Sequence, residues 1–122
     1  MAKPGLILLY VTDPIRSANF YEPIFKTKPV EKSPGYAMFV LEGGLKIGFW
    51  KRDEVQPEAE GGPGSMELVF AEASDADVDE RFAEWTGKGI VIAQKPTRLE
   101  FGYTFVGLDP DGHRLRVYKL AQ

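Results

Sequence analysis

The segment Phe101–Leu120, with the sequence FGYTFVGLDPDGHRLRVYKL, decides how this chain folds. Two runs of alternating apolar and polar residues flank its central tetrapeptide Asp109–Gly112. Pro110 fixes φ at the first corner of a turn, and Gly112 provides a position at which φ can be positive. The segment therefore predicts a β-hairpin.

The last strand of this hairpin has two different faces. Leu115 and Val117 point to one face, which suits a core, because side chains alternate along a strand. Arg114, Arg116 and Tyr118 point to the other face. Arginines that share a face with a tyrosine make this surface a candidate binding site.

The composition is that of a globular protein of one domain. The chain has 122 residues, of which 43% are hydrophobic and 27% charged, and this length suffices to bury a core. The formal net charge is −3 and there is no basic run, so we expect no nucleic-acid partner.

The start of the chain and the cysteine count bear on localisation. The opening MAKPGLILLYV is too short for a membrane span and lacks a signal-peptide cleavage pattern, so no membrane partner is expected. The chain has no cysteine, which suits a cytoplasmic protein.

The first half of the chain predicts a strand, a helix and a hairpin. Leu6–Thr12 is an apolar run typical of a buried strand. Asp13 followed by Pro14 is typical of a helix start, and the helix is expected to run for about three turns. Tyr36–Leu41 and Leu45–Lys51 predict two further strands joined by a glycine turn.

The second half follows a polar linker, Arg52–Ser65, which we expect to be flexible because it is rich in proline and glycine. Beyond it the patterns predict, in order, a strand over Met66–Ala71, a helix from Ser74 or Asp75 to about Thr86, a short strand over Ile90–Ala93 and a loop over Gln94–Glu100.

The two halves repeat one pattern. Asp13 and Phe20 are matched by Asp75 and Phe82 at an offset of 62 positions. The pattern predicts an α+β fold with two βαβββ modules, in which curled mixed sheets form a concave cleft and the helices lie on the outer faces. The expected boundaries are 1–52 for module one, 53–64 for the linker and 65–122 for module two.

The segments VTDPIRSANFYEPIFKTKPV and FGYTFVGLDPDGHRLRVYKL resemble the two ends of a vicinal-oxygen-chelate domain. That superfamily contains glyoxalase I, extradiol dioxygenases and bleomycin-resistance proteins, and its paired βαβββ modules match the duplication. The resemblance implies the fold, but it fits enzymes and binding proteins alike.

The resemblance also indicates where a metal would bind in the enzymes of the family. The corresponding positions here are Leu6, Gly48, Glu67 and Arg116, and only Glu67 is of a residue type that these enzymes use as a ligand, with a strand register uncertain by one residue. His113 is the only histidine and is interpreted as a solvated turn residue. We therefore expect no metal and no other cofactor.

A concave aromatic cleft remains as the candidate site. Gly48 would leave room beside Trp50 on one strand face, or simply ease a bend in the strand. Trp50 is a candidate ligand wall, with packing at a rim or interface as the alternative. Tyr103 and Phe105 share a face that is either cleft or core, and Tyr10 shares a face with Leu6 and Leu8.

Two arginines and a glutamate complete the candidate site. Arg116 either contacts a ligand carboxylate or phenolate, or forms a salt bridge with Glu67 across the position of the metal. Arg114 is interpreted as a solvated charge at the end of the strand.

The chain is similar to phenazine antibiotic-resistance proteins of the superfamily. The similarity lies in the segments LLYVTDPIRSANFYEPIFKTKPV and DVDERFAEW and in the Gly48–Trp50 strand. The similarity implies a homodimer that binds a planar aromatic small molecule at its interface without a metal, with Trp50 stacked on the ligand, and that confers resistance by sequestration. The alternatives are a metal-dependent glyoxalase- or dioxygenase-type enzyme with an atypical metal site, and a regulatory module whose own side chains fill the cleft.

Overall fold

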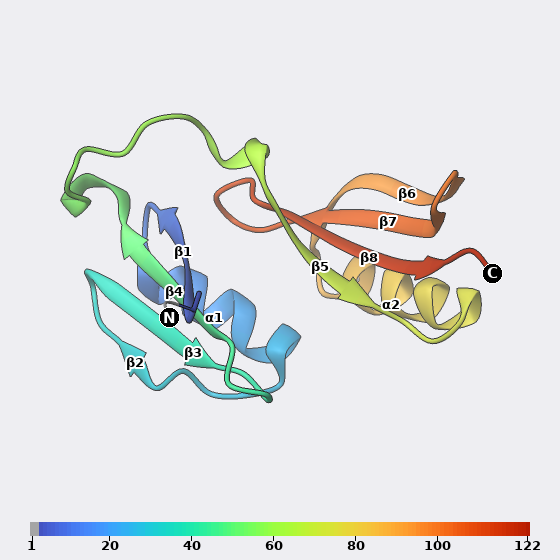
Figure 1. Cartoon of the computed structure of the whole chain (residues 1–122), viewed down its shortest axis with the longest axis horizontal. Helices are drawn as coiled ribbons and strands as arrows, with labels where there is room; N and C mark the ends of the chain where they lie inside the picture. Colours follow the sequence, from blue (N-terminus) through green and yellow to red (C-terminus); the bar gives the residue numbers. More distant parts are fainter. Residues whose placement is uncertain (1–2) are drawn as a thin grey trace. The chain divides into compact units, whose positions relative to one another are not determined.

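The computed structural model describes residues 3–122, which form two compact units, 3–61 and 62–122. Within the described residues there are two α-helices and eight strands, in two mixed four-stranded sheets (Figure 1). The predicted α+β fold with two βαβββ modules is confirmed.

Unit one contains a strand, a helix and three further strands. The elements are β1 (Leu6–Val11), α1 (Pro14–Phe25), β2 (Glu31–Lys32), β3 (Tyr36–Val40) and β4 (Lys46–Lys51). The strand order in the sheet is β1-β4-β3-β2, with β1 parallel to β4 and the other pairs antiparallel. The short β2 was not predicted, because two residues are too few to show an alternating pattern.

Helix α1 starts where the sequence predicts. The side chain of Asp13 accepts hydrogen bonds from the backbone N–H groups of Ile15 and Arg16 at 3.1 and 3.2 Å, and Pro14 occupies the first helical position. The helix continues past Pro23 to Phe25, and Lys26 ends it in the left-handed conformation with φ of 56°.

The core of unit one lies between α1 and one face of its sheet. Tyr21 stacks on Phe49 and on Phe25, with ring centroids 4.8 and 5.0 Å apart, and Phe25 meets Phe39 edge to face. Leu9 of β1 is buried on the same face. The sheet is therefore covered by a helix on one face, and its other face is left for a different use.

Unit two repeats this order. Its elements are β5 (Glu67–Ala71), α2 (Asp75–Gly87), β6 (Val91–Leu99), β7 (Gly102–Leu108) and β8 (Arg114–Leu120). The strand order β5-β8-β7-β6, with β5 parallel to β8, is the topology of the first sheet. The duplication inferred from the sequence is thus present in the topology of both sheets.

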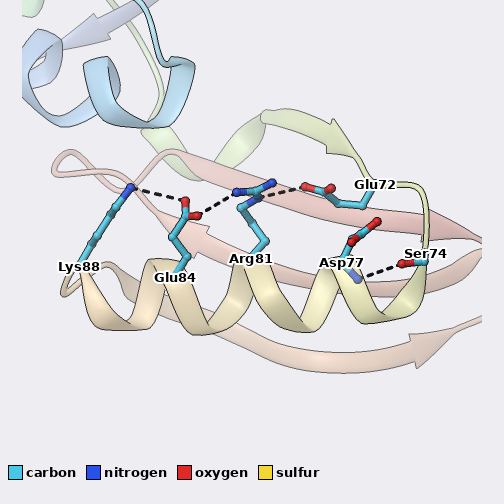
Figure 2. Close-up of polar contacts among 6 residues, drawn as sticks. All are labelled: Glu72, Ser74, Asp77, Arg81, Glu84 and Lys88. Carbon is cyan, nitrogen blue, oxygen red and sulfur yellow. Dashed lines mark hydrogen bonds and ion pairs between the residues drawn. The ribbon is translucent and has the colours of Figure 1, made fainter.

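A polar network runs along α2 (Figure 2). Ser74 caps the helix by accepting a hydrogen bond from the N–H of Asp77. Arg81 donates to Glu72, just beyond β5, and to Glu84, both at 3.0 Å. These contacts tie the exposed side of the helix to the end of the strand that precedes it.

The core of unit two is built around Trp85 of α2. Its ring meets Phe105 and Phe70 edge to face, with centroids 5.3 and 5.8 Å apart, and Phe82 also contacts Phe105. A Cβ atom at Gly107 would lie 3.1 Å from the indole, so glycine allows Trp85 to pack closely on β7.

The prediction of a loop over Gln94–Glu100 is wrong, because strand β6 continues to Leu99. The register of β6 against β7 shifts between Ile92 and Gln94 and again between Gln94 and Thr97. These bulges break the alternation on which strand prediction depends, and Pro96 is tolerated because β6 is an edge strand.

The linker contains local structure. Two short 3₁₀ helices, Arg52–Glu54 and Pro63–Ser65, lie near its ends. Arg52 donates a hydrogen bond to the carbonyl of Gly61 at 2.6 Å, and Val55 is buried. The linker is thus partly organised by its own contacts.

Replacing Phe105 with alanine is expected to lower the free energy of unfolding by about 3–5 kcal/mol, because the ring is fully buried beside Trp85. Phe101→Ala is the matched control, since that ring is 42% exposed, and its effect should be clearly smaller. Urea denaturation followed by circular dichroism measures both. Equal effects of the two substitutions would contradict this placement of Phe105.

Candidate functional site

The face of the first sheet that lies opposite α1 carries apolar and aromatic side chains. Leu6, Leu8 and Tyr10 project from this face of β1, because Leu9 and Val11 occupy the core face. Leu6 is 42% exposed, and Leu8 and Tyr10 are 36% exposed. This open face of unit one therefore presents apolar surface to its surroundings.

Trp50 lies on this open face near the end of the central strand β4 and is half-buried. It is paired with Tyr10 of β1 and with Tyr36 of β3 in the register of the sheet. The rings of Tyr10 and Trp50 are arranged edge to face, with centroids 6.4 Å apart and an interplanar angle of 77°. Three aromatic residues from three adjacent strands thus gather in one row.

Gly48 does not leave an open space beside Trp50, and the interpretation that it would is corrected here. A Cβ atom on Gly48 would lie 2.5 Å from the Tyr36 hydroxyl and 2.8 Å from a methyl group of Leu8. The side chains of Tyr36 and Leu8 therefore fill the position. A side chain at position 48 would force the ends of the Tyr36 and Leu8 side chains to shift.

Tyr36 is a site residue that the sequence reasoning missed. Its hydroxyl donates to the sulfur of Met38 at 3.5 Å, and Met38 lies on the same face. Burial raises the pKa of Tyr36, and the nearby Glu31 carboxylate raises it further, so the phenol is neutral at pH 7. The predicted hairpin over 36–51 contained the signal, since its register places Tyr36 opposite Trp50.

The open face of the second sheet holds an ion pair between β5 and β8. Arg116 donates from Nε to one oxygen of Glu67 and from Nη2 to the other, both at 2.9 Å. This bidentate geometry is the strong form of an arginine–carboxylate contact. Of the two alternatives for Arg116, the structure has the salt bridge, and Glu67 is on the open face.

Further polar groups surround this pair. Nη1 of Arg116 lies 3.3 Å from Oγ1 of Thr104 and 3.4 Å from Oε1 of Gln94. Hydrogen bonding from Arg116 lowers the pKa of Glu67, an effect that burial opposes and the charges of Arg116 and Arg114 reinforce. The carboxylate is therefore ionised well into the acidic range.

His113 is buried, so its interpretation as a solvated turn residue is wrong. Its Nδ1 lies 2.9 Å from Oδ2 of Asp109, and its backbone N–H donates to Oδ1 of the same carboxylate at 2.8 Å. Both residues are 5% exposed. The pair fixes the turn between β7 and β8, where Gly112 has φ of 94°.

Tyr103 and Phe105 lie on the helix-covered face of β7. Phe105 is in the core between Trp85 and Phe82, which was the alternative left open for it. Tyr103 donates to Asp79 of α2 at 2.6 Å, and this hydrogen bond raises the pKa of the phenol. Neither side chain joins the open face that carries Arg116.

The similarity to known proteins extends over nearly the whole chain. A family model described as the glyoxalase/bleomycin resistance protein/dioxygenase superfamily matches residues 3–117. The chain belongs to this superfamily.

The individual relatives differ in what they indicate. The chain is 38% identical over 120 residues to phenazine antibiotic resistance protein EhpR of Enterobacter agglomerans, which covers 96% of this chain and 92% of that protein. It is 46% identical to an Agrobacterium tumefaciens protein of known solution structure, with a TM-score of 0.90 and full coverage of both chains. A glyoxalase-related enzyme from Fulvimarina pelagi has a TM-score of 0.82 and is 22% identical, and the match covers 98% of this chain and 88% of that chain. At this identity the likeness shows the fold alone.

The metal that enzymes of the glyoxalase superfamily carry does not fit the residues of this member. Leu6 and Gly48 offer no donor atom in their side chains, and Arg116 places a positive charge against Glu67. Across residues 3–122, no group of three or more His, Cys, Asp or Glu side chains is placed to hold a metal ion.

No helix within residues 3–122 of this superfamily member is long and apolar enough to cross a membrane.

The Glu67–Arg116 pair predicts a specific dependence of stability on pH. Because the folded-state pKa of Glu67 is lowered, its stabilising effect is complete above about pH 4.3 and is lost as pH falls through the folded-state pKa. Glu67→Gln should cost about 1–2 kcal/mol at pH 7, and the difference from wild type should shrink toward pH 3.

The control for this measurement is Glu58→Gln, which changes an exposed carboxylate in the linker. Urea denaturation at a series of pH values gives both free energies of unfolding. A loss for Glu67→Gln that stayed constant from pH 7 to pH 3 would show that the carboxylate charge does not stabilise the fold.

Proposed function

We propose that this protein binds a planar aromatic small molecule of the phenazine class without a bound metal, and that sequestration of this compound confers drug resistance. The observation that carries the proposal is the open face around Trp50, where Tyr10 and Tyr36 flank the indole. Flat polycyclic compounds bind to such surfaces by stacking and by burial of apolar area.

The comparison with EhpR supports the same ligand class. The name of that relative states phenazine antibiotic resistance, and the similarity extends over nearly the whole of both chains. Solved relatives under 25% identity add nothing on the ligand, because a fold hosts many functions.

The polar groups support binding without chemical conversion. The Arg116–Glu67 pair lies where the resemblance placed metal ligands, and the carboxylate oxygens are engaged by the guanidinium. We further propose that the protein acts in the cytoplasm as a homodimer, whose partner subunit shields part of the exposed apolar surface of β1.

Replacing Trp50 with alanine is expected to weaken phenazine binding about 3- to 10-fold or more. The stacking contribution alone is about 0.5–1.5 kcal/mol, and the loss of buried area adds to it. Isothermal titration calorimetry is the right measurement, because the variant also loses a fluorescent reporter. The free energy of unfolding is measured in parallel.

Trp50→Phe is the matched control, since it keeps a ring at the same position and should retain most of the affinity. In the wild type, phenazine should also quench part of the tryptophan fluorescence, with Trp85 as the buried remainder. Unchanged affinity in Trp50→Ala would remove this residue from the site.

Chelator treatment is expected to leave phenazine affinity unchanged, because the donor set does not suit a metal. Native mass spectrometry of protein purified without chelator should show the mass of a metal-free dimer. A stoichiometric transition metal, together with loss of binding after its removal, would instead favour an enzyme of the superfamily.

A further inference from the structure

The hydroxyl of Tyr36 is a polar group held in apolar surroundings on the open face of unit one. Tyr36 of β3 is paired with Trp50 of β4, and the next pair on the same face is Met38 with Gly48. A Cβ atom on Gly48 would lie 2.5 Å from the hydroxyl oxygen and 2.8 Å from Cδ2 of Leu8. The hydroxyl therefore lies over the backbone of Gly48, beside apolar side chains.

This hydroxyl has only a weak hydrogen-bond acceptor. Among residues 3–122, the acceptor found for it is Sδ of Met38, at a distance of 3.5 Å. A thioether sulfur accepts hydrogen bonds weakly. An exchange of this contact for a stronger acceptor on a ligand would therefore be favourable, because the hydroxyl gives up little.

The charges near Tyr36 favour a neutral acceptor. Burial raises the pKa of the phenol, and the Glu31 carboxylate raises it further, so the hydroxyl keeps a proton to donate at neutral pH. Glu31 is paired with Met38 in the register of β2 and β3 and so belongs to the same face. Its negative charge disfavours an anionic ligand group beside the hydroxyl.

The spacing on β4 relates the hydroxyl to a ligand stacked on the indole. Gly48 and Trp50 are two residues apart on one strand, which corresponds to about 6.6 Å. A fused aromatic ring system in contact with Trp50 can extend over this distance to the Tyr36 hydroxyl. A nitrogen within such a ring has a lone pair that points outward in the ring plane, whereas a carbocycle has only C–H groups at its edge.

We propose that the Tyr36 hydroxyl donates a hydrogen bond to a ring nitrogen of the bound ligand, so that the site selects neutral nitrogen heteroaromatic compounds over carbocycles of the same shape. This inference rests on the proposed function and adds a specificity-determining residue to it. On binding, the hydroxyl exchanges the sulfur of Met38 for the ring nitrogen, while Trp50 provides the stacking surface. A carbocycle would leave the donor with its weak acceptor.

Quinoxaline and naphthalene are the probes that test this proposal, because they have the same fused shape and only quinoxaline has ring nitrogens. Both are neutral at pH 7. Nuclear magnetic resonance of the full-length ¹⁵N-labelled protein gives their dissociation constants from the shift of the Trp50 indole N–H. Tyr36→Phe should weaken quinoxaline binding about 3- to 10-fold, as expected for loss of a neutral hydrogen bond, and should leave naphthalene binding unchanged.

The comparison of the two probes separates the hydrogen bond from packing. Any change in packing caused by Tyr36→Phe acts on both probes, so the ratio of their dissociation constants reports the hydroxyl alone. Tyr103→Phe is the matched control, because it removes a hydroxyl that donates to Asp79 on the helix-covered face of the second sheet, and both affinities should be retained. Equal weakening of both probes, or unchanged quinoxaline affinity in Tyr36→Phe, would overturn the proposal.

Phenazine itself, titrated in parallel, distinguishes failure of this inference from failure of the proposed function. Phenazine binding that is lost in Trp50→Ala but unchanged in Tyr36→Phe would remove the role of the hydroxyl and leave the proposed function. No phenazine binding by the wild type would reject the proposed function, and this inference with it. Weaker phenazine binding in both variants would support both.

Discussion

The packing of one helix against one face of each four-stranded sheet is the constraint on which the rest of the structure depends. Tyr21 of α1 stacks on Phe49, and Trp85 of α2 packs against Phe105, so the large buried rings all lie on the helix side. Because side chains alternate along strands, each sheet must then present a second face with a separate population of residues. The candidate sites lie on those second faces.

The two open faces have diverged although the topology is the same. In unit one the face carries Tyr10, Tyr36 and Trp50, and it is suited to stacking. In unit two the corresponding face carries Glu67 and Arg116, joined in a bidentate ion pair. Duplication thus supplied two scaffolds with equivalent cores, on which one face became aromatic and the other charged. This division explains why the superfamily fold alone does not give the activity.

Local sequence signals predicted the starts of the two helices well, because a helix cap depends on contacts between residues that are close in the chain. Asp13 and Ser74 cap the two helices by hydrogen bonds to nearby backbone N–H groups, as residues of their type do. Prediction failed where the alternation of apolar and polar residues is interrupted. In β6 two register shifts break this alternation, and most of the strand was predicted to be a loop. It also failed for His113, because burial of a turn residue depends on a partner, Asp109, whose orientation a pattern cannot show.

The sequence by itself predicted the duplicated α+β fold and the place of Trp50 on a strand face, since these follow from residue types and periodicity. The resemblance to the superfamily then indicated Leu6 and Gly48 as metal positions whose side chains offer no donor atom. Only the tertiary structure decided that Tyr36 fills the space over Gly48 and that Arg116 pairs with Glu67. These contacts join residues on neighbouring strands, and strand register and side-chain direction decide whether they meet. Such choices are made by packing, which no local pattern encodes.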